Sequence, residues 1–328
     1  MDAELNMKTA AALALTVSVA LPATAFAQNW PAKPLRVVVP FTAASATDTI
    51  ARIVAERLSA QFGQQLVVEN RPGAGGTIGV GTVARAEPDG YSILVHSSSF
   101  TVTPTTYPNT PYNTQKDLAG VTPLALLPQA LVVAPGRGIN STQELVARAK
   151  ARPGALTYGS AGLGTANQLN AERFRIGAGI DTLHVPFKGT PEVVSEVLGG
   201  RIDYFFCPVN VCVPLIADKR VVALGMGSSR RSAALPDLPT TVEQGVPESN
   251  YDFWVGMFVP SGTPREIVDK LYVETAKVLA KPEVKENLAK LGAEQNLIEP
   301  RAFDAVIARE IAANAALVKA AGIPIAGQ

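Results

Sequence analysis

The sequence predicts an α/β protein built from two lobes. Two segments, 37–58 and 156–174, each combine a short apolar strand, a loop of small and polar residues, and an amphipathic helix. Two further stretches, around 124–133 and 253–259, are apolar enough to be strands that cross between lobes. We therefore expect each lobe to hold a mainly parallel sheet with flanking helices, with two crossing strands joining the lobes.

Residues 1–27 are predicted to be a secretory signal peptide and not part of the fold. Lys8 precedes an apolar run at 10–21, and Ala25-Phe26-Ala27 gives the small-x-small pattern of a cleavage site, so cleavage is expected after Ala27. The run is too short and too rich in alanine for a membrane span, and no later segment is long and apolar enough to be one. The mature protein is expected to be soluble and exported.

The composition of the mature chain excludes several classes of partner. Removal of residues 1–27 leaves 301 residues with 28 basic and 26 acidic side chains. A net charge of +2 without a basic block argues against a nucleic-acid partner.

Cys207 and Cys212 could pair in an oxidising compartment or remain as buried thiols, and the sequence leaves both alternatives open. Neither His96 nor His184 is near them in sequence, which argues against a zinc site, and no metal or cofactor is expected.

The first strand–loop–helix unit is the stretch around which the chain is organised. Residues 37–39 are all valine and suit a buried strand, and the loop 41–48 offers Thr and Ser as helix N-caps. The apolar residues of 50–58 recur at helical spacing. This order aims unpaired backbone N–H groups and the positive end of a helix dipole at one point, where an anion could bind. An ordinary βα turn that binds nothing is the simpler interpretation of this segment alone.

The next elements are strands at 66–70 and 92–96. The glycine-rich stretch 73–79 between them has the wrong spacing for a dinucleotide-binding loop, because its G-x-G is not followed by a glycine three residues on. We interpret it as a turn that lets a helix and a strand approach closely. The hydroxyl-rich loop 97–101 could face a cleft, and Ser98 is its candidate ligand contact.

The second unit repeats the first arrangement in the other half of the chain. Ser141 and Glu144 form a capping box for a helix through 149. Residues 156–168 then again combine strand, small polar loop and helix start. One such loop is common, but a pair in separate halves predicts a ligand held between two lobes.

The rest of the chain is expected to complete both lobes. Thr263, Pro264 and Glu266 have the pattern of an N-cap, a first and a third helical residue. The remaining expected elements are a strand ending at 184–190, a helix that Pro191 starts, strands at 202–206 and 221–226, the return crossing at 254–259, and helices at 263–280, 283–291 and 303–320.

Short motifs in order along the mature chain carry a resemblance to a known family. They are Trp30-Pro31-Ala32-Lys33-Pro34, Pro40-Phe41 with Thr47-Asp48, Val68-Glu69-Asn70-Arg71-Pro72-Gly73-Ala74-Gly75-Gly76, Pro88-Asp89-Gly90-Tyr91, His184-Val185-Pro186-Phe187-Lys188-Gly189, Leu235-Pro236-Asp237-Leu238-Pro239-Thr240 and Pro260-Ser261-Gly262-Thr263-Pro264. The chain resembles the Bug family, the TctC-like extracytoplasmic solute-binding proteins of tripartite tricarboxylate transporters. The resemblance spans essentially the whole mature chain.

The resemblance implies a two-lobed periplasmic-binding-protein fold that closes on a small carboxylate and carries out no catalysis. It implies a periplasmic monomer whose partner is the membrane permease of the transporter. The expected division is a signal peptide at 1–27, the first part of lobe 1 at 28–127, lobe 2 at 128–253 and the return of lobe 1 at 254–328.

The resemblance also places the ligand at the loops 41–48 and 160–168, through backbone N–H groups, hydroxyls and water. The predicted ligand-binding residues are Phe41, Thr42, Ala43, Ala44, Ser45, Ala46, Thr47, Ser98, Ser160, Gly162, Gly164, Thr165, Ala166, Asn167, Gln168, Lys188, Cys207 and Asn210. The chain departs from the family pattern where Ala44-Ser45 replaces Gly-Gly, Gln168 replaces His, Cys207 replaces an acidic residue and Asn210 replaces Pro.

These departures bear on the ligand. An amino acid would need an acidic partner for its ammonium group, and Cys207 stands where relatives often carry one. Phe41, Phe205, Phe206 and Asn210 would suit a flat or apolar body with polar ends, although each aromatic could equally belong to a strand core. We therefore expect a dicarboxylate without an amine, and prefer an aromatic one such as a phthalate isomer, terephthalate for example, over a short aliphatic acid.

Two other function classes remain open at this point. A ligand-sensing subunit of a signalling system would show the same features. A secreted hydrolase would need a Ser or Cys nucleophile beside a His, and no Gly-x-Ser-x-Gly elbow is present. His96 beside the serines of 97–99 is the one tempting arrangement, and a hydroxyl-lined cleft explains it as well.

Overall fold

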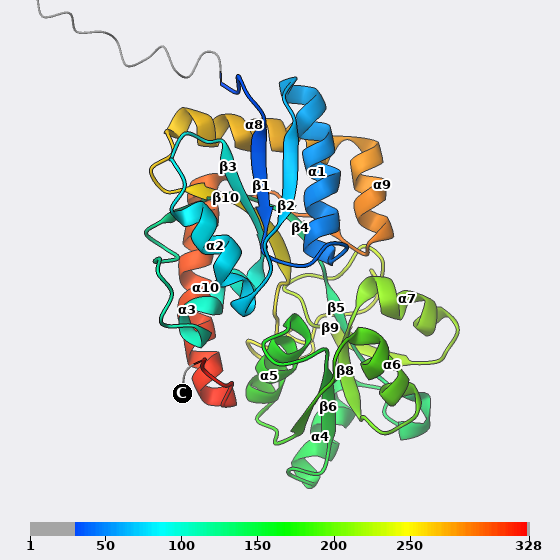
Figure 1. Ribbon diagram of the computed structural model, residues 1–328. Coiled ribbons are helices and arrows are strands. Elements are labelled where there is room, and N and C mark those ends of the chain that lie inside the picture. Colours follow the sequence, from blue (N-terminus) through cyan, green and yellow to red (C-terminus); the bar gives the residue numbers. More distant parts are fainter. Residues whose placement is uncertain (1–29, 327–328) are drawn as a thin grey trace, which may run out of the picture.

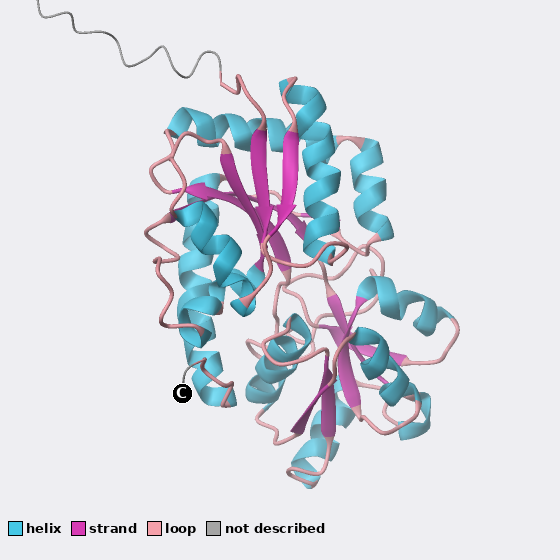
Figure 2. Ribbon diagram, viewed as in Figure 1, coloured by secondary structure: helices cyan, strands magenta, loops and turns pink. Residues whose placement is uncertain are grey.

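A computed structural model describes residues 30–326 as two α/β lobes, one above the other in the view of Figure 1. The predicted signal peptide and its cleavage site lie outside these residues. Each lobe is a sheet with helices on both faces, as the colouring of Figure 2 makes clear. None of the helices within 30–326 is long and apolar enough to span a membrane.

The first lobe is organised by a six-stranded sheet in the order β11-β4-β10-β3-β1-β2. Its strands are β1 (Leu35–Val39), β2 (Leu66–Asn70), β3 (Ser92–Ser97), β4 (Leu118–Leu126), β10 (Trp254–Pro260) and β11 (Glu294–Gln295). Its helices are α1 (Ala46–Phe62), α2 (Thr77–Ala84), α3 (Thr103–Thr106), α8 (Arg265–Ala280), α9 (Pro282–Lys290) and α10 (Pro300–Ala321).

The valine run predicted as a buried strand is the reason both faces of this sheet are covered. Val37 and Val39 pack into a core shared with α1, α8 and α9, whereas Val38 packs into a second core with α2 and α10. All three valines are almost fully buried. Because neighbouring side chains of a strand point to opposite faces, three apolar residues in a row need a layer of helices on each side.

The second lobe holds a five-stranded sheet in the order β7-β6-β8-β5-β9. Its strands are β5 (Gln129–Val133), β6 (Thr157–Ser160), β7 (Leu183–Pro186), β8 (Tyr204–Pro208) and β9 (Val222–Met226). Its helices are α4 (Thr142–Ala151), α5 (Ala166–Ala178), α6 (Thr190–Leu198) and α7 (Val209–Ala217). One core lies under α4 and α5 and a second under α6 and α7.

Both sheets are mixed, and the expectation of mainly parallel sheets holds for only part of each. β1 pairs in parallel with β2 and β3, and β6 with β7 and β8. β10, β4 and β11 pair antiparallel in the first sheet, as β5 does with β8 and β9 in the second. The antiparallel pairs arise because a strand that enters or leaves a lobe at the crossing runs opposite to strands connected by βα units.

The first crossing is two strands and not the single strand predicted around 124–133. β4 ends at Leu126 in one sheet and β5 begins at Gln129 in the other. Pro128 lies at the break and has no N–H group to donate to a ladder. The Leu127 N–H donates to the Phe253 carbonyl at 2.7 Å, so the two crossings are bonded to each other.

Candidate functional site

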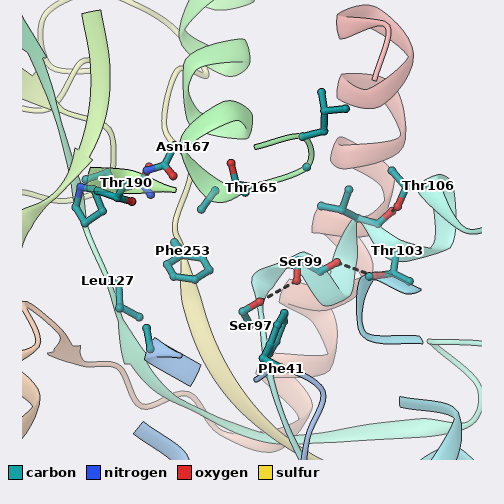
Figure 3. A pocket seen from close by; sticks show the side chains of 18 of the residues that line it. Phe41, Ser97, Ser99, Thr103, Thr106, Leu127, Thr165, Asn167, Thr190 and Phe253 are labelled. Carbon is teal, nitrogen blue, oxygen red and sulfur yellow. Dashed lines mark hydrogen bonds between the residues drawn. The ribbon is translucent and has the colours of Figure 1, made fainter. Parts of the chain in front are cut away.

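A cavity of about 860 Å³ lies between the lobes, beside the two crossings. Its polar lining residues are Thr49, Ser97, Ser99, Thr103, Thr106, Tyr107, Gln129, Thr165, Asn167, Thr190 and Asn210. Figure 3 shows Thr165, Asn167 and Thr190 of the second lobe facing the hydroxyl-bearing residues of the first, with the Phe253 ring beside them. Among the described residues, no Asp, Glu, Lys, Arg or His lines the cavity.

The loop between β1 and α1 has a defined hydrogen-bonded geometry. Ser45 is the N-cap of α1, and its Oγ accepts a hydrogen bond from the Asp48 N–H at 3.2 Å. Ala44 has a left-handed backbone with φ of 63°, and its N–H donates to Asp48 Oδ2 at 2.9 Å. This is a capping box in which the third helical residue reaches one residue further back than usual. Its effect is to fix the backbone that leads into α1.

The loop between β6 and α5 repeats this geometry in the second lobe. Thr165 is the N-cap of α5 and Gly164 before it is left-handed, with φ of 72°. The Gly164 N–H donates to Gln168 Oε1 at 2.7 Å, which matches the bond from Ala44 to Asp48. Both loops are therefore held by the side chain of the third helical residue, a carboxylate in one lobe and a neutral amide in the other.

This bonding decides which N–H groups can face a ligand. The N–H groups of Ala44 and Gly164 are used inside their own loops. The first-turn N–H groups of α1 at Ala46 and of α5 at Ala166 and Asn167 have no acceptor among the described residues, and all three residues line the cavity. The donors available to an anion are thus in the first helical turns.

Two more helices begin at the same cavity. Thr190 is the first residue of α6, and Asn210 and Val211 are the second and third residues of α7. The N-terminal turns of α1, α5, α6 and α7 therefore meet at one cavity without a charged side chain in its lining. Each helix N-terminus carries a partial positive charge, so together they favour a negatively charged ligand.

Asp48 is the one carboxylate in these loops, and its charge is paired with Arg52 outside the cavity lining. Its residue is 2% exposed, and it accepts hydrogen bonds from Arg52 Nε and from Asn70 Nδ2 as well as from Ala44. Burial alone would raise the pKa of the Asp48 carboxyl, but these hydrogen bonds outweigh burial and hold the pKa below its usual value. Its charge is directed to the loop and to Arg52, and the side chain does not line the cavity.

His184 supports the second loop from β7. Its Nδ1 accepts from Gln168 Nε2 at 3.2 Å, so the Nε2–H donates to Ser160 Oγ at 2.6 Å. Burial lowers the pKa of His184 against the opposing field of Glu172, which keeps the imidazole neutral. The Ser160 hydroxyl in turn donates to the Gly162 carbonyl at 3.0 Å. This serine–histidine pair has a structural role, because the hydroxyl proton is already donated and Ser160 is fully buried outside the cavity lining.

His96 does not form the arrangement that a hydrolase would need. It is fully buried, and its Nδ1 bonds to the Ser97 carbonyl at 2.9 Å and not to a serine hydroxyl. Burial lowers its pKa to about 4, so it is neutral at physiological pH. The hydroxyls of Ser97 and Ser99 bond to each other at 2.8 Å and line the cavity, in agreement with the alternative of a hydroxyl-lined cleft.

The structure brings together eight of the residues predicted to bind ligand. Those that line the cavity are Phe41, Ala44, Ala46, Gly164, Thr165, Ala166, Asn167 and Asn210. The predicted residues that do not line it are Thr42, Ala43, Ser45, Thr47, Ser98, Ser160, Gly162, Gln168, Lys188 and Cys207. Ser45 and Gln168 of the second group use their polar atoms to support the loops themselves.

Three of the predicted residues lie outside the cavity lining for distinct reasons. The Ser98 hydroxyl is buried against the Tyr251 hydroxyl at 3.0 Å, because the chain enters a 3₁₀ turn that points its neighbours Ser97 and Ser99 into the cavity instead. Lys188 is exposed, and its N–H donates to Glu192 Oε2. Cys207 is a buried free thiol whose pKa is raised by its contact with Cys212 and by burial.

Other lining residues were not predicted. Phe253 of the return crossing and Thr190 at the start of α6 could have been anticipated, since a crossing and a helix start were both recognised in the sequence. Thr103 and Thr106 of α3 and the segment 323–326 after α10 carry no sequence signal of this kind. Phe205 and Phe206 are fully buried on β8, which agrees with the strand-core alternative and not with a surface for the ligand body.

Comparison with known proteins agrees with this architecture. The family model described as the tripartite tricarboxylate transporter family receptor, TctC, matches residues 50–323. The chain belongs to this family. The receptor is 40% identical over 264 residues to the UPF0065 protein in the tcbD-tcbE intergenic region of Pseudomonas sp. strain P51, which covers 80% of this chain and 79% of the relative. It is 33% identical over 309 residues to protein BugT of Bordetella pertussis, with 94% of each chain covered.

Solved structures of the same type are also similar to the receptor. R. palustris Rpa4515 with adipate superimposes with a TM-score of 0.74 at 31% identity, over 90% of this chain and 99% of that chain. MatC of Rhodopseudomonas palustris with bound malate superimposes with a TM-score of 0.70 at 28% identity, over 88% of this chain and 100% of that chain. The resemblance to the Bug and TctC-like proteins and the two-lobed fold are thereby confirmed. The receptor is a periplasmic solute-binding protein of a transporter and not an enzyme.

Proposed function

We propose that this receptor captures a small dicarboxylate that lacks an amine, in the cavity between its lobes, for delivery to the membrane permease of its transporter. The observation that carries the proposal is the meeting of four helix N-termini, from both lobes, at a cavity without a charged lining residue. Backbone N–H groups at helix starts bind carboxylates without a basic side chain.

The same lining argues against an amino acid. An ammonium group needs acceptors, and a carboxylate partner is the usual one in a buried site. The cavity lining within residues 30–326 contains no Asp or Glu, and Asp48 is turned to Ala44, Arg52 and Asn70. Aspartate or glutamate would therefore leave a buried cation unpaired.

The ligand body is the finer part of the proposal. Adipate in Rpa4515 and malate in MatC support the dicarboxylate class. The rings of Phe41 and Phe253 line the cavity of this receptor together with Leu127, Leu163 and Val211. A flat apolar body would bury area against these side chains, so we favour an aromatic dicarboxylate such as terephthalate over a short aliphatic acid.

The proposal includes closure of the lobes about the crossings, with lobe 1 formed by 28–127 and 254–328 and lobe 2 by 128–253. The ligand donors are split between the lobes, so full contact requires both to approach the ligand. We expect a monomer whose mature chain begins at Gln28. Small-angle scattering of the mature protein should show a smaller radius of gyration with ligand, and mass spectrometry of the exported protein would identify its first residue.

A melting-temperature screen tests the function. Terephthalate, adipate, malate, succinate, aspartate and benzoate would each be added to the mature protein, since a ligand that binds only the native state raises its melting temperature. We expect shifts with the dicarboxylates, largest with terephthalate, and calorimetry should then give their dissociation constants. Tight binding of aspartate with none of terephthalate, adipate or succinate would contradict the proposal.

A further inference from the structure

The segment 323–326 turns away from the end of α10 and runs along the cavity. Gly322 ends the helix in a left-handed conformation with φ of 63°, and the Ile323 N–H donates back to the Val318 carbonyl at 3.0 Å. The Ala326 N–H then donates to the Thr106 carbonyl at the end of α3 at 2.8 Å. Figure 1 shows the red end of α10 near α3 and α5. The segment is thus fixed at both of its ends.

This segment contacts both lobes next to the ligand loop of α5. Ile323 is 6% exposed and belongs to a cluster with Val102 of the first lobe and Leu169 of α5. Ile325 is half-buried and packs against the same cluster, as do Ala166 and Phe253. Ile323 therefore anchors the segment, whereas Ile325 remains partly open toward the cavity that it lines.

The chemistry of the segment differs from that of the rest of the lining. Residues 323–326 all line the cavity and present only apolar side chains. The helix starts and the hydroxyls of Ser97 and Ser99 provide the polar donors elsewhere in the same cavity. A ligand whose carboxylates occupy the donors needs an apolar surface for its body, and burial of that body favours binding.

We propose that the segment 323–326 is a specificity wall that receives the apolar body of the ligand, with Ile325 as its selecting side chain. This inference rests on the proposed carboxylate function. It assigns the receptor a preference for carboxylates that carry a ring or a long methylene chain over short polar ones. The bond from the Ala326 N–H to the Thr106 carbonyl ties the end of the wall to α3.

Calorimetric titration with terephthalate and succinate tests the wall. Ile325→Ala should weaken terephthalate binding roughly four-fold, the affinity equivalent of about one buried methylene, and change succinate binding less than about two-fold. Ile325→Trp adds volume at the same place and should exclude terephthalate more strongly than succinate. Ile311→Ala is the matched control: Ile311 is a half-buried isoleucine on α10 outside the cavity lining, and its replacement should change neither affinity.

The outcomes separate the inference from the function on which it rests. Equal losses for both acids in Ile325→Ala, or no loss for either, would overturn the specificity wall and leave the carboxylate function standing. Binding of succinate without terephthalate by the unmodified protein would do the same. Heat signals absent with every dicarboxylate, in a protein whose melting curve shows it folded, would refute the proposed function and the inference with it.

Discussion

Replacing Asp48 should expose how strongly the loop between β1 and α1 depends on a single buried carboxylate. Asp48→Ala removes the acceptor of the Ala44 N–H at 2.9 Å and of Asn70 Nδ2 at 2.8 Å, together with the ion pair to Arg52. The residue is 2% exposed, so water cannot readily replace these partners. Loss of the carboxylate would leave the left-handed backbone at Ala44 without the bond that holds it.

The expected magnitude follows from these three contacts. Hydrogen bonds to a buried charged group contribute roughly 1.5–3 kcal/mol each, although such values do not add in full. The Arg52 side chain is 49% exposed, and solvent screening limits its pair with Asp48 to about 1 kcal/mol or less. We expect Asp48→Ala to lower the free energy of unfolding by about 3 kcal/mol, and Asp48→Asn, which keeps an acceptor oxygen, by about half as much.

The sign of the pH dependence is fixed by the lowered pKa of Asp48. A depressed folded-state pKa stabilises the native state above the usual Asp pKa, and this contribution is lost as the pH falls through the folded-state value. The stability difference between the unmodified protein and Asp48→Asn should therefore be constant from neutral pH down to about 5 and shrink below about 4.

Urea unfolding followed by tryptophan fluorescence measures this effect in the correct lobe, because both tryptophans, Trp30 and Trp254, pack into cores of the first lobe. Glu144→Ala is the matched control. The Glu144 carboxylate likewise accepts a hydrogen bond, from the Asn140 N–H at 2.7 Å, but at the exposed start of α4. Its loss should cost below about 1 kcal/mol. Equal effects of Asp48→Ala and Glu144→Ala would refute the reasoning.

Three further predictions concern neighbouring groups. Ala44→Gly should raise the melting temperature, with a gain of up to about 1 kcal/mol, because an alanine at φ of 63° is strained; a lower melting temperature would contradict this. Ser45→Ala should cost about 1 kcal/mol of stability through the lost N-cap, yet leave terephthalate affinity within about two-fold, since its hydroxyl serves the Asp48 N–H; a ten-fold loss by calorimetry would make Ser45 a ligand contact. Burial raises the pKa of Glu310 to about 7 despite the bond from Trp254, so this group's stabilisation is present below about pH 4.5 and lost as the pH rises through 7. Unfolding at pH 5 and pH 8 should show Glu310→Gln gaining up to about 3 kcal/mol relative to the unmodified protein over that interval, and parallel curves would contradict the assignment.

The sequence predicts the two loops at the cavity, between β1 and α1 and between β6 and α5, because each depends on local patterns. A buried strand, small polar residues and an amphipathic helix are all visible within about twenty residues of chain. The Ser141–Glu144 capping pattern predicts its helix for the same reason, and Ser141 Oγ does accept from the Glu144 N–H. The Thr263 N-cap is wrong: Pro264 occupies that position and α8 begins at Arg265, because fixed proline geometry determines the entry to the helix.

The sequence predicts less well which side chains reach the cavity, because side-chain rotamers and the packing of distant segments determine this. Gln168 has the composition of a ligand contact, but its two polar atoms are occupied by Gly164 and His184. Ser98 and its neighbours differ only in which side of a 3₁₀ turn they occupy. The wall at 323–326 comes from the far end of the chain, and its place beside α5 depends on the packing of α10 against both lobes.

The most direct test of the central claim, that helix starts at a cavity without charged lining residues bind a carboxylate between the lobes, is calorimetry on a receptor with a negative charge placed among those donors. Ala46 is the first residue of α1 and lines the cavity, and a carboxylate there favours the helix dipole, so Ala46→Asp should remain stably folded. At about 5 Å from a bound carboxylate the added charge should weaken terephthalate and adipate binding roughly 100-fold, whereas the neutral isostere Ala46→Asn should weaken it less than about ten-fold. Affinities of the two variants within about three-fold of each other would show that the anion does not bind at these helix starts.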